Sequence, residues 1–440
     1  MIPANYNIVE GHTESVALFT NKPTNTAVQN VEESLYRPVS QLSSSSSYLE
    51  FSIPGTSKYL DLSKTKLNLQ VKITRSDGAP LDSEDNVAFI NLPLQTMFSQ
   101  VDVSLNQIPI NKIPAPLYAY KSYLDVLLNN GEEAKESWLQ GQLYHSDTPG
   151  HLDNYLPYGL SENAGLNAGL VTRWSHTQES RLVELEGPLH VDFFHQPRYL
   201  LNNVSVHVKL WQSPDSFRLM GDTSKTSYRV QIVDAALKVT GITVTPEIIL
   251  AHEQCLMKTP ALYPMYQSDF KVFAIAKGDL FFAADNLWNS QVPSKVYIML
   301  TSAQGFNGDF TKNPLNLQHC NLNYLSFTVD GISKPASKPL TPDFENDKYT
   351  EAFLSLFSAS NMMGKNVGCD ISRYGYKHGY TIFGLDLDGN HSSDYLPLPK
   401  QSHIRIEAKF SKPLEESVNM LVYAKFPTCL KIDQARNVVM

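Results

Sequence analysis

The sequence predicts an all-β chain of two tandem antiparallel eight-stranded jelly rolls, each with a short helix, preceded by an N-terminal arm. Two observations predict this fold class. The same structural signals occur in the same order in residues 49–211 and again in residues 228–426. Within each stretch, many short segments alternate apolar and polar residues, and one segment has helical spacing. A long strand that closes each half fits a jelly roll better than a meander.

The first repeated signal is a half-buried strand that ends in a tight turn. Residues 101–108 read VDVSLNQI and residues 325–332 read LSFTVDGI, a displacement of 224 positions. Period-two alternation buries one face of a strand, and Asn or Asp followed by a small or polar residue favours a reversal. We therefore expect a β-hairpin at the same place in each half.

The second repeated signal is a short amphipathic helix after the hairpin. A proline precedes it and an Asn-Gly pair follows it, as is typical of helix ends. Its counterpart is residues 353–357 (FLSLF), which lie 230 positions after residues 123–127. The apolar side chains of the first helix recur three and four residues apart, at Leu117, Tyr120, Leu124, Leu127 and Leu128.

The third repeated signal is a closing strand that follows a Phe-x-x-Pro motif. The motif at residues 194–197 precedes an alternating strand over 204–210, and the motif at residues 410–413 precedes one over 420–426. The displacement here is 216 positions. The three displacements differ by the length of a loop, which fits two copies of one fold whose loops have drifted apart.

These signals divide the chain into five parts. The N-terminal arm is polar, lacks a clean periodicity and ends in a serine run, and a turn-rich linker separates the rolls. Residues 129–180, rich in Gly, Asn, His and Tyr, predict a long loop region with a functional or interaction role. The expected parts are the arm (1–47), the first jelly roll (48–212), the linker (213–227), the second jelly roll (228–428) and a C-terminal tail (429–440).

Charge and hydropathy argue against several classes of function. The net charge is −8, and neither terminus carries a cluster of Lys and Arg. Because counterion release from phosphates requires such clusters, we expect no strong direct binding of nucleic acid. The N-terminus lacks the pattern of a secretory signal, and no stretch approaches the roughly 18 apolar residues that a transmembrane segment needs. We therefore expect no transmembrane segment, and the sequons at Asn203 and Asn390 are expected to be unused.

The four cysteines predict free thiols. Cys255, Cys320, Cys369 and Cys429 are widely separated, form no C-x-x-C pair and all lie in the second half. They cannot be a disulfide framework for the whole chain. We expect buried, unpaired thiols in a protein made in a reducing compartment.

We predict no catalytic, cofactor-binding or metal-binding residue, and no cofactor. No two of the twelve histidines are separated by a single residue, so the H-x-H pair of a metal-dependent cupin is absent. His145 and His151 flank a polar segment that we interpret as a solvated turn. His207 is out of phase with its apolar strand neighbours, so we expect it at the surface.

Two further segments resemble functional motifs and are better explained as structure. The acidic residues 386–394 do not match a calcium-binding EF-hand, because Gly389 is fourth instead of sixth and the twelfth residue is Pro397. Asp388-Gly389 is expected to be a hairpin turn. Cys369 could pair with His378, but nothing marks it as a nucleophile. No G-x-S-x-G, P-loop or H-E-x-x-H motif is present.

One part of the chain resembles the capsid proteins of the polinton (Maverick), adintovirus and virophage lineage. Residues 94–106 (LQTMFSQVDVSLN) form a strand that ends in a turn, and residues 118–128 (YAYKSYLDVLL) contain a Tyr-x-x-Tyr-Leu-x-x-Leu-Leu helix pattern. This local similarity covers about 35 residues. The tandem rolls, chain length, N-terminal arm and lack of enzyme motifs extend the resemblance over most of residues 48–426.

The resemblance implies a double jelly-roll major capsid protein of a DNA virus, which is a structural protein and no enzyme. Such proteins form homotrimers whose six rolls make a pseudo-hexameric capsomer, and the capsomers tile an icosahedral capsid. The implied partners are further copies of the chain and penton and minor or cement capsid proteins. The implied location is the virion, after synthesis and assembly inside the host cell. Residues 129–180 and 277–322 are candidates for tower or inter-subunit loops.

Two other functions remain open at this point. A carbohydrate-binding or hydrolytic double β-sandwich protein would need stacked aromatic residues in a concave site, or a pair of carboxylates, and the sequence pairs none across the fold. Glycan binding by a monomer would favour that function. A minor capsid or vertex protein fits less well, because vertex proteins of this lineage usually carry one jelly roll.

Overall fold

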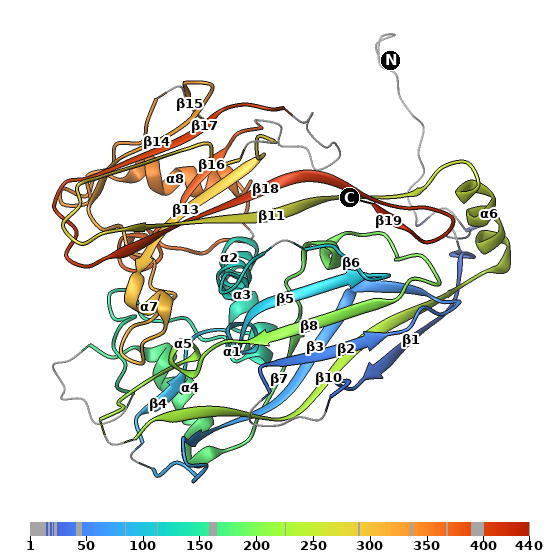
Figure 1. Ribbon diagram of the computed structural model, residues 1–440, viewed down its shortest axis with the longest axis horizontal. Helices are drawn as coiled ribbons and strands as arrows, with labels where there is room; N and C mark the ends of the chain where they lie inside the picture. The colour runs from blue at the N-terminus through green and yellow to red at the C-terminus, as the bar shows by residue number, and fades with distance from the viewer. Residues whose placement is uncertain are drawn as a thin grey trace.

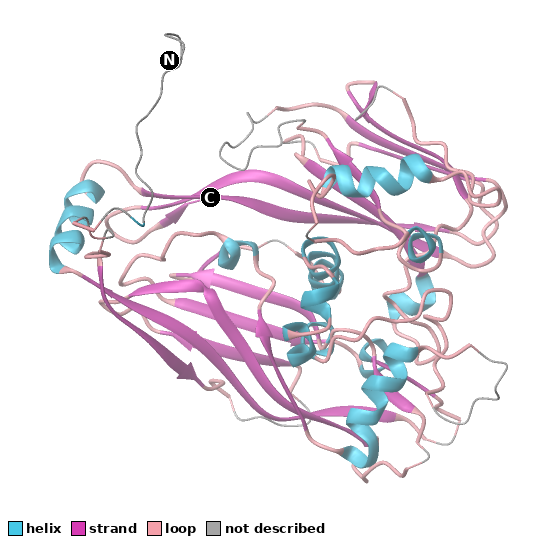
Figure 2. Cartoon of the chain, turned by 180° about the vertical axis from the view of Figure 1, so that it is seen from behind, coloured by secondary structure: helices cyan, strands magenta, loops and turns pink. Residues whose placement is uncertain are grey.

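The computed structural model describes residues 15, 18–19, 21, 24–40, 46–83, 85–111, 113–157, 165–224, 226–288, 291–334, 338–366, 368–388 and 400–439. It consists of two β-sandwiches that lie side by side, with helices between them and at both ends (Figures 1 and 2). Each sandwich has two antiparallel sheets.

The first sandwich is an eight-stranded jelly roll. Its first sheet has the order β1 (Val28–Tyr36), β10 (Tyr228–Val244), β3 (Tyr59–Arg75) and β7 (Val183–Pro188). Its second sheet has the order β2 (Tyr48–Ile53), β8 (Val206–Gln212), β5 (Phe98–Leu105) and β6 (Ile108–Pro109). A small separate sheet pairs β4 (Val87–Phe89) with β9 (Leu219–Gly221).

The second sandwich repeats this topology. Its first sheet has the order β11 (Ala261–Ile275), β18 (Val418–Ile432), β13 (Lys295–Ser302) and β16 (Phe383–Asp386), with β19 (Val438–Val439) added to β18. Its second sheet has the order β12 (Phe281–Asp285), β17 (Ile404–Phe410), β14 (Leu322–Val329) and β15 (Ile332–Lys334). In both rolls the first, eighth, third and sixth strands form one sheet, and the second, seventh, fourth and fifth form the other. The predicted double jelly roll is confirmed.

Helices occupy the connections between strands. The α-helices are α1 (Pro93–Thr96), α2 (Tyr118–Asn129), α3 (Glu132–Lys135), α4 (Ala168–Thr177), α5 (Asp215–Arg218), α6 (Pro246–Leu256), α7 (Ala303–Asn307), α8 (Thr350–Ala359) and α9 (Arg373–Lys377). Three 3-10 turns cover Trp138–Gln142 (η2), Gln178–Ser180 (η3) and Asp192–His195 (η4). The predicted helix pair corresponds to α2 and α8, which follow the same hairpin in the two rolls.

The two predicted hairpins are present and equivalent. β5 turns into β6 at Asn106 and Gln107, whose φ angles are 44° and 70°. β14 turns into β15 at Asp330 and Gly331, whose φ angles are 51° and 77°. Two positive φ angles in a two-residue loop are typical of the turn that matches the twist of a hairpin, and Asn, Asp and Gly tolerate them best.

The strand pairing divides the chain at other positions than we expected. β1 lies within the expected arm, yet it pairs with β10 as the first strand of the first roll. β10 lies within the expected second roll, yet it pairs with β3 of the first. The expected linker contains α5, in which Phe217 and Arg218 are buried, and the buried strand β9, and β18 runs into the expected tail. The reason is that a turn-rich loop within a domain has the composition of a linker, and an exposed edge strand shows little alternation.

The expected match between the closing strands is wrong. β8 lies beside the hairpin strand β5, and the strand in that place in the second roll is β17, whereas we matched β8 with β18. The counterpart of β18 is β10, since each lies between the first and third strands of its roll. Any two alternating strands of similar length share the same pattern, so periodicity cannot decide which of them are equivalent.

The connections define two ends of the molecule. Because successive strands of an antiparallel roll run in opposite directions, every second connection between strands lies at the same end of the roll. We call the loop end the one that carries the described residues within 76–97, 110–182 and 213–227 of the first roll and within 303–321, 335–382 and 411–417 of the second. α6 joins β10 to β11 at the opposite end, which we call the α6 end (Figure 1). Residues 129–180, expected to be a long loop, contain α3, α4 and two 3-10 turns, and residues 277–322 contain β12, β13 and α7.

Candidate functional site: the interface between the two rolls

The two rolls share their hydrophobic cores. Helix α2 follows the hairpin of the first roll, but its buried side chains Tyr120, Leu124 and Leu127 belong to one apolar cluster with the strands of the second roll. The ring of Tyr120 also stacks on Phe306 of the second roll, with the ring centroids 5.6 Å apart. In the other direction, the ends of β11 and β18 contribute to the core of the first roll. The two sandwiches therefore pack as one body, with α2 between them (Figure 1).

A charged cluster lies at the centre of this interface. The ammonium group of Lys121, whose side chain is 1% exposed, is 2.7 Å from Asp125 Oδ2 and 3.1 Å from Asp192 Oδ1. Lys121 and Asp125 are one turn apart on α2, and Asp192 lies in η4. From the second roll, Lys425 Nζ approaches Asp125 Oδ1 at 3.7 Å. The cluster pairs two lysines with two carboxylates, and Nδ1 of the buried His190 lies 3.5 Å from Asp125 Oδ2.

Hydrogen bonds extend the cluster into the strands of the second roll. The backbone N–H of Ser268 on β11 donates to Asp192 Oδ2 at 2.7 Å, and its hydroxyl lies 2.9 Å from Asp192 Oδ1. The Ser268 hydroxyl also lies 2.8 Å from the Tyr423 hydroxyl on β18. Since a buried polar group without a partner is costly, this chain of contacts favours one relative position of the two rolls.

The charges of the cluster support one another. Burial opposes ionisation of Asp125, but the neighbouring Lys121 and Lys425 outweigh it and hold its pKa well below the usual value of 3.8. Burial likewise disfavours the charge of Lys121, but Asp125 and Asp192 raise its pKa well above the usual 10.5. The pair is therefore ionised at neutral pH although both side chains are buried.

A second cluster joins the rolls at the loop end. The fully buried guanidinium of Arg173 on α4 donates to Asp147 Oδ1 at 2.6 Å and to two backbone carbonyl oxygens, those of Phe89 and His145. The Tyr380 hydroxyl of the second roll donates to the backbone carbonyl of Asp147 at 2.7 Å. The side chain of Asn313, also in the second roll, donates to Asp147 Oδ2 at 3.3 Å. This cluster connects the long loops of the first roll to two loops of the second.

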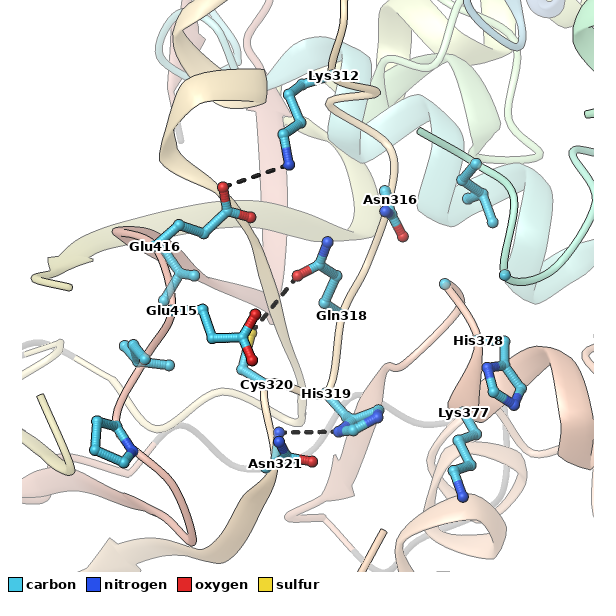
Figure 3. A pocket seen from close by; sticks show the side chains of 16 residues that line it. Lys312, Asn316, Gln318, His319, Cys320, Asn321, Lys377, His378, Glu415 and Glu416 are labelled. Carbon is cyan, nitrogen blue, oxygen red and sulfur yellow. Dashed lines mark hydrogen bonds and ion pairs between the residues drawn. The ribbon is translucent and has the colours of Figure 1, made fainter. Parts of the chain in front are cut away.

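A cavity of about 540 Å³ opens at the loop end beside this second cluster (Figure 3). On one wall, Lys312 Nζ lies 3.5 Å from Glu416. Burial, helped by Lys377, lowers the pKa of His319 to about 4, and its Nδ1 accepts a hydrogen bond from the backbone N–H of Asn321. Burial, followed by Glu416 and Glu415, raises the pKa of Cys320 to about 12. A nucleophilic cysteine requires a thiolate, and this thiol is protonated at neutral pH.

The residues that the sequence singled out are placed apart from one another. His145 lies beside His176, 5.9 Å between ring centroids, and burial lowers its pKa to about 4, whereas His151 is exposed. Among the described residues, no group of three His, Cys, Asp or Glu side chains is arranged to hold a metal ion. The expected turn at Asp388-Gly389 extends outside the described residues.

The cysteines differ in part from the expectation. All four are unpaired, as predicted. Cys369 is buried, and burial raises its pKa, but Cys255 is exposed on α6.

His207 is half-buried between the buried residues 206 and 208, as its phase in the strand predicted.

Sequence reasoning missed both charged clusters. Lys121 and Asp125 are four residues apart on the predicted helix, a spacing that places them on one face and could have been noticed. Their partners Asp192, Ser268 and Lys425 come from distant parts of the chain, and no local pattern marks them.

Comparison with known proteins gives one related sequence and several related structures. No protein-family model matches the chain. An uncharacterized protein of Caenorhabditis elegans is 24% identical over 405 residues, which cover 88% of this chain and 92% of that protein. In the part of the chain that the structure describes, no helix is long and apolar enough to cross a membrane.

The related structures come from viruses. A chain of the Sputnik virophage matches with a TM-score of 0.62 and 14% identity, over 99% of this chain and 93% of that one. The major capsid protein of mavirus matches with a TM-score of 0.55 and 11% identity, over 99% and 96%. The Faustovirus major capsid protein matches with a TM-score of 0.54 and 11% identity, over 94% and 92%. The chain therefore has the double jelly-roll fold found in viral major capsid proteins, over nearly its whole length.

Proposed function

We propose that this chain is a major capsid protein, that it forms homotrimeric, pseudo-hexameric capsomers, and that these capsomers tile an icosahedral shell. A closed trimer of a chain with two similar rolls contains six similar units around its axis. One protein can then occupy the hexagonal positions of a shell.

The observation that carries this proposal is the equivalence of the two rolls together with their fixed interface. Both rolls have the same strand order in both sheets. The shared cores and the cluster around Lys121 hold them side by side as one body. A trimer built from such chains has six units of similar shape and constant spacing, which a repeating lattice requires. A flexible connection between the rolls would not supply that constancy.

The proposal extends to orientation, partners and location. We place the loop end outward and the α6 end toward the interior of a virion capsid, with penton and minor or cement proteins as further partners. The chain would be synthesised and assembled inside a host cell. Its net charge of −8 supports packaging of a DNA genome by a motor or by separate basic proteins, because the chain offers few groups that neutralise phosphate.

The alternative of a carbohydrate-binding or hydrolytic protein has less support. The described residues that line the loop-end cavity include no Phe, Tyr or Trp on which a sugar ring could stack. Two carboxylates, Glu415 and Glu416, line this cavity, but they are adjacent in the chain and Glu416 is paired with Lys312. We therefore retain the structural function and propose no enzymatic one.

Mass in solution and electron microscopy test the proposal. We expect the purified chain to form a trimer of about 148 kDa, three times the chain mass of 49.3 kDa, and to assemble into shells with hexagonally arranged capsomers in negative stain. A monomer that persists at every concentration tested would contradict it. Binding of glycans by that monomer would favour the alternative.

A further inference from the structure

An apolar groove of about 600 Å³ opens at the α6 end of the molecule. It lies between α6, the connection at residues 197–201 and the beginning of β11. We propose that this groove binds the N-terminal segment, residues 1–23, of a neighbouring copy of the chain. This inference rests on the proposed function, because it supposes that copies of the chain lie next to one another in a shell.

The groove has the character of a protein-binding surface. Its exposed walls include Leu262, which is 47% exposed, and Tyr199, which is 39% exposed. Helix α6 contributes Ile248, which is half-buried, and Cys255, which is exposed. Apolar side chains that gather in a concave site and remain open to water mark a place where a partner docks.

The path of the chain leads to this groove. Ala27 and Val28 line its rim, and the backbone carbonyl of Ala27 accepts a hydrogen bond from Thr245 N at 3.1 Å. The N-terminal segment therefore joins the fold at the groove. Its described apolar side chains Leu18 and Phe19 are 78% and 100% exposed, so they are not in the groove of their own chain. A segment of 23 residues reaches up to roughly 80 Å, enough to contact an adjacent copy.

The charges of the two partners are complementary. The side chains that line the groove include Arg198 and no carboxylate among the described residues. Residues 1–23 contain Glu10 and Glu14 against the single cation Lys22, so the segment carries a small net negative charge. The apolar residues of the segment can enter the groove while its carboxylates approach Arg198 at the mouth.

Disulfide trapping tests the contact directly, because Cys255 lines the groove. Single cysteines are introduced into the segment as Ile8→Cys, Val16→Cys and Phe19→Cys, and assembled particles are oxidised with copper phenanthroline. We expect at least one variant to form covalent oligomers on a non-reducing gel, with the disulfide to Cys255 identified by mass spectrometry. Adding Cys255→Ser to that variant should remove the oligomers. A disulfide confined to a single chain, or none in any variant, overturns the inference.

The reactivity of Cys255 gives a second readout. If the groove is occupied nine-tenths of the time, labelling of Cys255 by a maleimide in assembled particles should be about tenfold slower than in a variant that lacks residues 1–23. Equal rates would contradict the inference. If the full-length chain never assembles, the proposed function itself fails, and light scattering before each experiment separates the two cases.

A pair of matched variants tests the groove itself. Leu262→Glu places a carboxylate among the apolar walls, where the acidic N-terminal segment should avoid it. Leu250→Glu changes a residue that is 60% exposed on α6 and does not line the groove. We expect the first variant to lose the trapped oligomers and the second to keep them. Equal trapping in both variants would show that the segment binds elsewhere.

Discussion

Removal of the charge on Lys121 tests the central cluster between the rolls. In Lys121→Met the side chain keeps a similar length, and the lysine that remains is Lys425, 3.7 Å from Asp125, with the His190 ring 3.5 Å from the same carboxylate. Removing one partner of a buried ion pair costs about 3–5 kcal/mol, because the other charge stays buried without compensation. We expect the free energy of unfolding to fall by about this amount, which is a large part of the 5–15 kcal/mol typical of a folded protein.

Urea unfolding followed by tryptophan fluorescence measures this loss. Lys338→Met is the matched control: Lys338 Nζ lies 2.9 Å from Glu351, but the two side chains are 61% and 52% exposed, so we expect a loss below about 1 kcal/mol. The double variant Lys121→Met/Asp125→Asn removes one charge of each sign. It should be more stable than the sum of its single variants predicts, by about 1–3 kcal/mol. Additive losses, or no loss in Lys121→Met, would refute the argument.

Acid unfolding gives an independent check on the same cluster. A carboxyl whose pKa is lowered in the folded state stabilises the fold above its ordinary pKa, and this contribution is lost as the pH falls through the folded-state pKa. Because the pKa of Asp125 is held well below 3.8, the wild-type protein should lose this contribution only in strong acid. Lys121→Met should depend less steeply on pH there. Urea midpoints measured from neutral pH to about pH 2 make the comparison.

Three further substitutions have outcomes that the structure predicts. Arg173→Met leaves the fully buried carboxylate of Asp147 without its cation, and the urea midpoint should fall as for a loss of about 3–5 kcal/mol. His319 has a folded-state pKa of about 4 against an ordinary 6.5, so the unfolded chain binds the proton first and stability falls as the pH drops between these values. His319→Gln should reduce this dependence of stability on pH, by about 3 kcal/mol in total at most. Thermal melts over a series of pH values measure it. Gly221→Ala would place a Cβ 2.3 Å from a backbone oxygen and should prevent soluble expression, whereas Gly331→Ala meets nothing within 4 Å and should cost only about 1–2 kcal/mol for its φ of +77°.

The repeated fold could be predicted because its signals are local. The two hairpins depend on alternation and on the residues of the turn, and Asp330-Gly331 and Asn106-Gln107 adopt the expected conformation. The helix at residues 118–129 depends on apolar spacing and end signals, and its observed bounds differ from the apolar pattern by one residue at each end. These features lie within about a dozen residues, so the sequence contains all that is needed to find them.

The boundaries and the pairing of strands could not be predicted in the same way. β10 carries the alternation of an ordinary strand, and only its hydrogen bonds to β1 and β3 assign it to the first roll. β8 resembles β18 in its alternation of apolar and polar residues, but its place in the sheet corresponds to that of β17, and only the strand pairing shows this. Pairing joins residues that are far apart in the chain, and period-two patterns are interchangeable between strands of similar length.

By itself, the sequence determined that the chain is all-β, that it contains two copies of one plan, and that a helix follows each hairpin. The tertiary structure alone decided where one roll ends and how the two are joined. Lys121 and Asp125 look like an ordinary pair on a helix surface until Asp192 and Lys425 arrive from other elements and water is excluded around them. Local patterns act over a few residues, whereas burial and charge compensation are properties of the assembled interior.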